Sequence, residues 1–84
     1  MTELRFPCPC CGYLTFLHEP DGTYEICPVC RWEDDPVQLN DPDFSGGANE
    51  PSLNQARENF RKLGAKHQDS VVFARAPTAE EKPN

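Results

Sequence analysis

Short apolar and polar stretches alternate along the first third of the chain, in a pattern typical of half-buried strands. In residues 1–7 the apolar Leu4 and Phe6 stand at alternate positions, and residues 13–18 are rich in aromatic and branched side chains. Residues 19–22 contain an Asp-Gly pair, which favours a tight turn because glycine reaches positive φ at little cost. Residues 23–26 then supply a returning strand. The pattern therefore predicts a short lead-in strand followed by a β-hairpin.

One helix is predicted, over about residues 52–64, because apolar side chains recur there at helical spacing. The apolar stripe consists of Leu53, Ala56, Phe60 and Leu63. Ser52 stands at the N-cap, and Gln55 follows three residues later to complete a capping box. Gly64 stands where a glycine favours the end of a helix. Beyond the helix, residues 71–74 are predicted to add a short strand.

The chain has 84 residues, nine of them prolines, and only 37% of its residues are hydrophobic. A chain of this length buries only about 60% of the surface of its unfolded state, so it needs a further source of stability. We expect a single domain over residues 1–76 and a disordered polar tail at residues 77–84. Residues 40–49 are predicted to form a long polar loop.

Four of the five cysteines form two pairs with the spacing C-x2-C-x15-C-x2-C, which is typical of a tetrathiolate zinc site. The predicted metal ligands are Cys8, Cys11, Cys27 and Cys30. A disulfide framework is less favoured, because five is an odd number and no apolar leader precedes the first cysteine. We therefore expect a protein of the reducing cytoplasm.

A metal held by four thiolates has no open position for water or substrate. We therefore predict a structural metal, no catalytic residues and no enzymatic activity. Zinc is the favoured ion and iron is the alternative, because iron also takes four thiolates from two such pairs. His18 and His67 are expected to be ordinary polar residues, since four cysteines complete the site.

The two cysteine-bearing turns differ in one position. We call residues 8–12 the first knuckle and residues 27–31 the second knuckle. Gly12 ends the first knuckle, whereas Arg31 stands at the equivalent place in the second, whose turn is therefore expected to close differently. Cys10, inside the first knuckle, is open to three interpretations: a reactive thiol, an exchanging ligand, or a small side chain on the outer surface, which we favour.

The chain has a formal net charge of −6, and four thiolates with one zinc ion add two more negative charges. Phosphate backbones repel such a protein, so nucleic acid is not the favoured partner. One side of the predicted helix is nevertheless basic, and it is either a solvated surface or a nucleic-acid contact. Its cationic residues are Arg57, Arg61, Lys62 and Lys66.

Carboxylates gather in residues 33–49, which we call the acidic loop. Its acidic residues are Glu33, Asp34, Asp35, Asp41 and Asp43. The acidic loop is either a solvated segment or the surface that contacts a basic protein partner, and we expect any partner there. Calcium is not favoured, because Ser52 stands where a calcium loop requires a bidentate glutamate.

Five stretches of the sequence carry a resemblance to a known family. They are FPCPCCGY at residues 6–13, YEICPVC at 24–30, WEDD at 32–35, GGAN at 46–49 and SLNQAR at 52–57. Together they resemble the bacterial cysteine-rich CPCC family over most of the chain. The resemblance implies a small cytoplasmic domain with a zinc site, in which Cys10 and residues 46–49 are regular features. It implies no activity.

The sequence thus predicts an α+β fold: a zinc-ribbon-like β-hairpin with two CPxC knuckles and one C-terminal helix packed on it. Trp32, Phe44 and Phe60 are expected to bridge the hairpin and the helix. The predicted function is that of a monomeric, metal-stabilised interaction module without membrane contact. The alternatives are a rubredoxin-like iron electron-transfer protein, a nucleic-acid-binding zinc ribbon, and a thiol-redox protein that uses Cys10.

Overall fold

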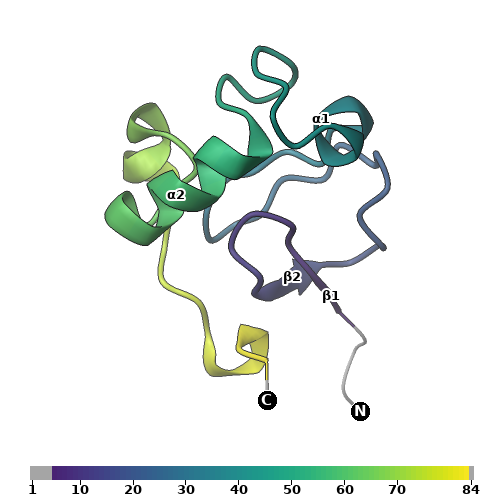
Figure 1. Cartoon of the computed structure of the whole chain (residues 1–84). Helices are drawn as coiled ribbons and strands as arrows, with labels where there is room; N and C mark the ends of the chain where they lie inside the picture. Colours follow the sequence, from purple (N-terminus) through teal and green to yellow (C-terminus); the bar gives the residue numbers. More distant parts are fainter. Residues whose placement is uncertain (1–4, 84) are drawn as a thin grey trace.

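The computed structural model describes residues 5–83 as a small α+β protein (Figure 1). Its elements, in chain order, are β1 (Phe6–Pro7), β2 (Leu14–Phe16), α1 (Pro36–Asn40), α2 (Leu53–Leu63) and two 3-10 helices, η1 (Gln68–Phe73) and η2 (Ala79–Glu81). In Figure 1 both α-helices lie above the two strands, with long loops between them. Within residues 5–83, no helix is long and apolar enough to cross a membrane.

The two strands form an antiparallel sheet in which Phe6 lies opposite Phe16. β2 therefore pairs with the lead-in segment, and the predicted pairing of residues 13–18 with residues 23–26 is wrong. The lead-in strand itself is confirmed at β1, although residues 1–4 of the predicted stretch lie outside the described residues. The pairing places the first knuckle at the tip of the hairpin, between β1 and β2.

The predicted returning strand pairs instead with the chain that follows the second knuckle. Ile26 forms a β-bridge with Glu33, and the amide of Tyr24 donates to the carbonyl oxygen of Asp34 at 3.0 Å. Tyr24 has a φ of 60°, which interrupts an extended strand. Each knuckle therefore lies at the tip of its own short antiparallel ladder.

The carboxylate of Glu25 lies beside the two residues that follow β2, at the place where the sequence predicts a paired strand. Glu25 accepts hydrogen bonds from the backbone amides of Leu17 at 2.8 Å and His18 at 3.4 Å. These two amides are satisfied by a side chain, so no strand is needed to pair with them.

The predicted helix is confirmed as α2. Ser52 caps it by accepting from the amide of Gln55 at 3.1 Å, and Gly64 ends it with a φ of 78° and a hydrogen bond to the carbonyl oxygen of Phe60. The side chain of Gln55 donates to Asn59 at 2.9 Å and does not complete a capping box.

Two short helices lie where the sequence does not predict them: α1 lies within the acidic loop, and η1 overlaps the strand predicted at residues 71–74. Asp35 caps α1 by accepting from the amides of Val37 and Gln38, and Pro36 occupies the first turn. A helix of five residues is too short to show an apolar stripe. The strand predicted at residues 71–74 is wrong: η1 covers most of it.

The C-terminal segment is attached to the rest of the protein by an ion pair. Glu81 is only 3% exposed, and its carboxylate pairs with both terminal nitrogens of Arg75 at 2.8 Å. This guanidinium lowers the pKa of Glu81 to about 2. The sequence predicts disorder for residues 77–84, and the structure describes residues 77–83 with η2 among them. The division into a domain at residues 1–76 and a tail stays a prediction.

The core is built around sulfur and a few large apolar side chains. Its buried members are Cys8, Cys10, Phe16, Cys27, Val29, Cys30, Trp32, Leu53 and Ala56. Trp32 is fully buried, and Phe60 of α2 packs at the edge of this core against Tyr13, with ring centroids 6.1 Å apart. Phe44 is 42% exposed, so its predicted bridging role is wrong.

Candidate metal centre

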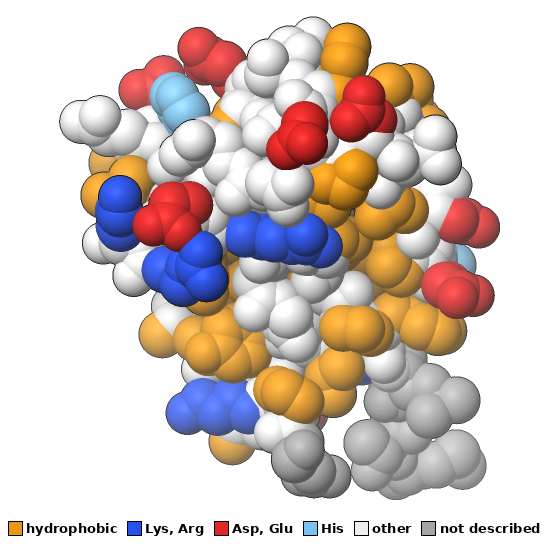
Figure 2. All heavy atoms as spheres, viewed as in Figure 1, with side chains coloured by type: hydrophobic (Ala, Val, Ile, Leu, Met, Phe, Trp, Pro, Cys, Tyr) orange, Lys and Arg blue, Asp and Glu red, His pale blue; other side chains and the backbone are white. Residues whose placement is uncertain are grey.

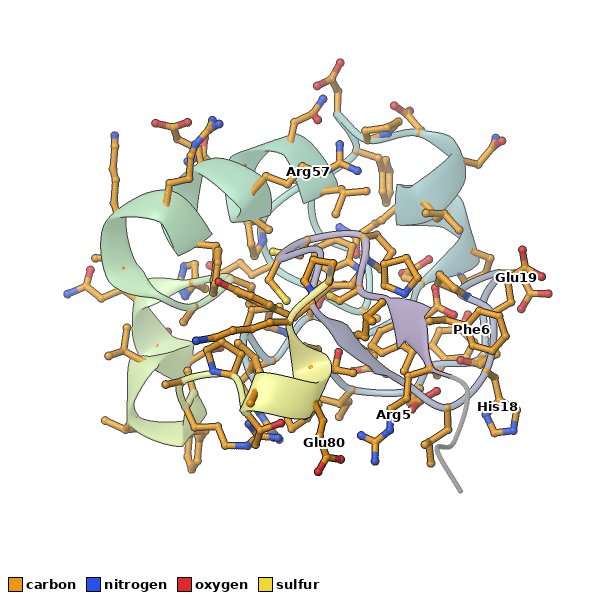
Figure 3. All side chains as sticks on the ribbon, turned by 90° about the horizontal axis from the view of Figure 1, so that it is seen from below. Arg5, Phe6, His18, Glu19, Arg57 and Glu80 are labelled. Atoms are coloured by element: carbon orange, nitrogen blue, oxygen red, sulfur yellow. The ribbon has the colours of Figure 1, made fainter. Side chains whose placement is uncertain are left out.

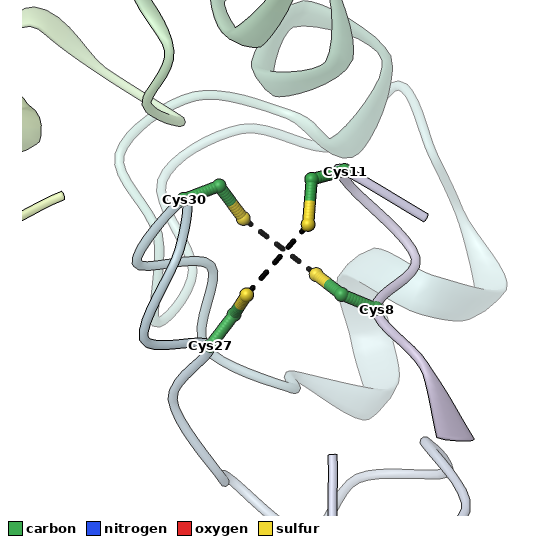
Figure 4. Close-up of side chains that lie close together, drawn as sticks. All are labelled: Cys8, Cys11, Cys27 and Cys30. Atoms are coloured by element: carbon green, nitrogen blue, oxygen red, sulfur yellow. Dashed lines mark hydrogen bonds between the residues drawn. The ribbon is translucent and has the colours of Figure 1, made fainter. Parts of the chain in front are cut away.

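The four paired cysteines converge on one point, although they come from two separate ladders (Figure 4). The sulfur of Cys8 lies 3.6 Å from that of Cys30, and the sulfur of Cys11 lies 3.7 Å from that of Cys27. All four sulfurs lie within 4.8 Å of one another. A tetrahedron with metal–sulfur bonds of about 2.3 Å has sulfur–sulfur edges of roughly 3.8 Å. The cluster therefore has the size of a tetrathiolate metal site.

The same distances are too long for disulfides, whose sulfurs are about 2.05 Å apart, and all five cysteines are free. Three of the clustered thiols are buried and Cys11 is partly exposed. Four thiols that converge without forming disulfide bonds can act together as ligands of a zinc or iron ion.

The two knuckles close in the same way, which corrects the expectation that they differ. The amide of Gly12 donates to the carbonyl oxygen of Cys8 at 2.8 Å, and the amide of Arg31 donates to that of Cys27 at 2.8 Å. Gly12 has a φ of 80° and Arg31 a φ of 74°. The arginine thus adopts the left-handed conformation that glycine tolerates, at a cost of about 1–2 kcal/mol. The requirement to aim two sulfurs at one point overrides this local preference.

Two groups outside the four thiols contact their sulfurs. The amide of Cys10 donates to the sulfur of Cys8 at 3.4 Å, and the hydroxyl oxygen of Thr15, on β2, lies 3.1 Å from the sulfur of Cys27. Hydrogen bonds to a coordinating sulfur disperse its negative charge and hold its orientation. Thr15 gave no sequence signal, because a threonine in a strand pattern is ordinary.

The thiols also perturb one another. Hydrogen bonding with Cys11 first, and then with the two other clustered thiols, lowers the pKa of Cys27. The pKa of Cys30 is raised, first by its hydrogen bond with Cys10. A metal ion that binds there must displace the protons of these thiols.

The favoured interpretation of Cys10, a side chain on the outer surface of the knuckle, is wrong: Cys10 is only 8% exposed and belongs to the core. It is not one of the four thiols that converge. A small apolar side chain suits this place in the core, and a free cysteine behaves as one. No role as a metal ligand is needed to explain it.

A half-buried lysine lies beside the second knuckle. The backbone amide of Lys66 donates to the carbonyl oxygen of Cys30 at 2.9 Å, and its ammonium group donates to the side-chain oxygen of Asn49 at 2.8 Å. Burial lowers the pKa of Lys66. The ammonium is the kind of cation that offsets the excess negative charge of a tetrathiolate site.

Both histidines lie apart from the cysteines. His18 is at the outer edge of the molecule (Figure 3), 3.6 Å from Glu25. His67 lies near Glu50 and Asp69, and these three groups could approach one ion. However, the ring nitrogen Nδ1 of His67 already accepts the amide of Asp69 at 3.2 Å, and both carboxylates are more than three-quarters exposed. These three residues therefore do not form a preorganised, buried metal site.

The carboxylates of the acidic loop divide into internal and external groups. Asp34 is fully buried, and one of its oxygens accepts hydrogen bonds from the amides of residues 21–23 and from the Thr23 hydroxyl. Asp35 caps α1 and also accepts from the amide of Ala48 at 2.8 Å. The negative charge of these two residues is thus used to fasten loops.

A buried amide network holds the acidic loop in its folded-back conformation. Asn49 is fully buried; its side chain accepts from the amide of Glu33 and donates to that residue's carbonyl oxygen, both at 2.8 Å. Gln38, also fully buried, donates to three loop carbonyl oxygens and accepts from Asn49. Sequence reasoning missed both residues, because a buried amide and a solvated one look alike in a polar stretch.

The cations of the predicted basic flank are engaged within the protein. Arg57, on α2 (Figure 3), donates to the carbonyl oxygen of Pro9 in the first knuckle at 2.9 Å. Arg61 and Lys62 both pair with Glu58. These contacts give the basic residues a structural explanation.

Fold and site together define a small α+β protein with a four-cysteine cluster that could hold a metal ion. The family model for cysteine-rich CPCC proteins matches residues 6–81, so the chain belongs to the cysteine-rich CPCC family, as its motifs predicted. No curated protein matches the chain.

Proposed function

We propose that this protein binds one zinc ion through Cys8, Cys11, Cys27 and Cys30, and that the ion is structural. The convergence of four sulfurs at distances of 3.6 and 3.7 Å, close to the edges of a zinc tetrahedron, carries the proposal. The arrangement is zinc-ribbon-like in that two knuckles at the tips of two ladders share one ion.

A structural ion of this kind matters because the rest of the core is small. A zinc ion in a four-thiolate site contributes on the order of 10–16 kcal/mol of apparent folding free energy. That exceeds what a core with three large fully buried apolar side chains (Trp32, Phe16 and Leu53) is expected to supply. Free thiols and a closed site both favour a non-enzymatic protein of a reducing compartment such as the cytoplasm.

We further propose that the protein acts as a monomeric interaction module, with the acidic loop as one contact surface. Asp41 and Asp43 are exposed on this loop, and Phe44 adds an apolar side chain that is 42% exposed. An exposed aromatic ring among carboxylates is suited to a basic protein partner. Nucleic acid is not proposed as a partner, because the protein's formal net charge of −6 repels phosphate backbones.

Elemental analysis of the purified protein tests the metal. We expect about one zinc ion per chain and a colourless solution; a red solution with one iron per chain would replace zinc by the electron-transfer alternative. The matched variants are Cys30→Ser and Cys10→Ser, which change two buried cysteines of the same region. Cys30→Ser should lose the metal and Cys10→Ser should retain it. The reverse result would show that Cys10, and not Cys30, is a ligand.

A further inference from the structure

An apolar groove lies on the side of the molecule formed by the end of α2, η1 and the segment that follows it. Its volume is about 310 Å³, and its lining includes Val29, Phe60, Leu63, Val71, Ala74 and Arg75. Most of these side chains are aliphatic or aromatic, and Arg75 supplies one cation. The floor is buried: Val29, inside the second knuckle, is only 1% exposed.

The walls of the groove continue onto an exposed apolar surface. Leu63 is 46% exposed and Val71 is 40% exposed; next to Val71 in sequence, Val72 is 81% and Phe73 is 69% exposed. Two of these side chains, Leu63 and Val71, line the groove, and Val72 and Phe73 add exposed apolar surface on the same 3-10 helix as Val71. Exposed apolar surface of this kind is costly for a small protein to leave in water and marks contact surfaces.

The charge around the groove is opposite to that of the protein as a whole. Residues 56–83, which supply all but one of the groove residues and include Glu81, the partner of Arg75, hold six cationic and four anionic side chains, a formal charge of +2. Residues 17–55 hold one cationic and nine anionic side chains, a formal charge of −8. On the face that carries α2, Lys and Arg side chains lie next to an apolar area (Figure 2). An anionic partner is therefore attracted to this side and repelled by the rest of the molecule.

We propose that the groove binds a short segment of another protein in which two or three neighbouring apolar side chains are flanked by carboxylates. The apolar side chains fill the groove, and the carboxylates lie near Arg61 and Lys62, since Arg75 is already paired with Glu81. The side chains of Arg61 and Lys62 are 73% and 71% exposed, so they remain accessible to a second anion. The proposal deepens the proposed function, since it rests on an interaction module, and it adds a contact surface separate from the acidic loop.

The groove is also attached to the metal centre. The amide of Arg75 donates to the carbonyl oxygen of Val29 at 3.2 Å, and that of Lys66 donates to the carbonyl oxygen of Cys30 at 2.9 Å. The second knuckle thus provides both the floor of the groove and two anchors for its wall. Partner binding through the groove therefore depends on an ordered second knuckle.

The test begins with a phage library of random twelve-residue peptides, selected on the metal-loaded protein. We expect the enriched peptides to combine adjacent apolar residues with Asp or Glu. One enriched peptide, made with a fluorescent label, is then titrated by fluorescence anisotropy against wild type, Val71→Glu and the matched control Val37→Glu. Val37 is 55% exposed on α1 and does not line the groove.

Val71→Glu should weaken binding by about tenfold or more, because it places a carboxylate in the apolar part of the contact. Val37→Glu should leave the dissociation constant within about twofold. Lys62→Glu and added salt should each weaken binding. Amide NMR shifts on titration should centre on residues 63 and 71–77.

Several results would overturn the proposal: no enriched peptides, enrichment of basic ones, or equal binding by Val71→Glu. Concentration-dependent dimers in sedimentation that disappear in Val71→Glu would assign the groove to a second copy of the chain. Zinc content is measured on every sample. Loss of peptide binding with zinc retained concerns the groove alone, whereas absence of zinc from wild type contradicts the proposed function.

Discussion

The two knuckles share one backbone conformation but are held in place by different means. The first is attached to α2 by a contact from an exposed side chain, Arg57 to the carbonyl oxygen of Pro9. The second accepts hydrogen bonds from the backbone amides of Lys66 and Arg75, and the buried Asn49 holds Glu33, two residues beyond it, and the ammonium of Lys66. The comparison teaches that the sulfur positions require one turn geometry, whereas the surroundings that fix this turn are free to differ.

The largest effect is expected from removing the metal, which affects both knuckles equally. Each knuckle supplies two of the four converging sulfurs, so neither is expected to keep its place when the proposed zinc ion is withdrawn. We expect a chelator at neutral pH to remove on the order of 10 kcal/mol of apparent folding free energy and to collapse amide NMR dispersion. Restoring zinc should restore the spectrum. Dispersed peaks that persist without metal would show that one or both knuckles are stable alone.

The next largest effect is expected from Asn49→Ala, which acts on the residues that surround the second knuckle. The change leaves the amide and carbonyl groups of Glu33 and the ammonium of Lys66 without their partner, at about 1–3 kcal/mol for each buried group. We expect a loss of about 3 kcal/mol or more in the free energy of unfolding, measured with denaturant on zinc-loaded protein.

Asn54→Ala is the control for this experiment. Asn54 is exposed, and its amide group donates to Asp43 at 2.9 Å on the surface. A loss below about 1 kcal/mol is expected. Equal losses for the two variants would mean that Asn49 does not anchor the residues that surround the second knuckle.

A smaller pair of opposite effects is expected at the equivalent ends of the two knuckles. Arg31→Gly removes an unfavourable left-handed conformation and should stabilise the protein by about 1 kcal/mol, whereas Gly12→Ala should destabilise it by about 1–2 kcal/mol. A Cβ added at Gly12 meets no atom within 4 Å, so the cost there is conformational alone. Changes of the same sign, seen in thermal unfolding of the zinc-loaded variants, would show that the knuckles are not equivalent.

The smallest effect is expected from Arg57→Ala, which acts on the first knuckle. It removes the hydrogen bond to Pro9 and a second, surface hydrogen bond to Asn54, both from an exposed side chain, and should cost about 0.5–1 kcal/mol. The melting temperature should fall by a few degrees or less, without loss of zinc. A loss as large as that of Asn49→Ala would reverse the comparison between the two knuckles.

The parts of the protein predicted correctly from sequence depend on neighbours along the chain. The two C-x2-C pairs were recognised because a two-residue spacer aims both sulfurs at one point, and α2 was recognised because its stripe and caps are local. The hairpin was predicted with the wrong partner, because strand patterns do not state which segments pair. Here Tyr24 takes a left-handed conformation and Glu25 satisfies the amides after β2.

The polar network was not predicted, because its partners meet only after the acidic loop has folded back. Asn49 reaches Glu33 across sixteen positions of sequence, and Gln38 reaches Asn49 across eleven. Gly47 gave no signal either, although a Cβ there would lie 2.6 Å from a carboxylate oxygen of Asp35. Such contacts depend on tertiary packing, so composition indicated only a solvated acidic segment.

The carboxylate of Glu25 has a further consequence for how the protein behaves at high concentration. A sheet of only two strands leaves backbone donors at its margin, and a neighbouring molecule can use such donors to add its own strand. Because Glu25 occupies the amides of Leu17 and His18, the chain just beyond β2 has two fewer donors to offer such a neighbour. A single acidic side chain thus shortens the edge to which a second copy could add a strand.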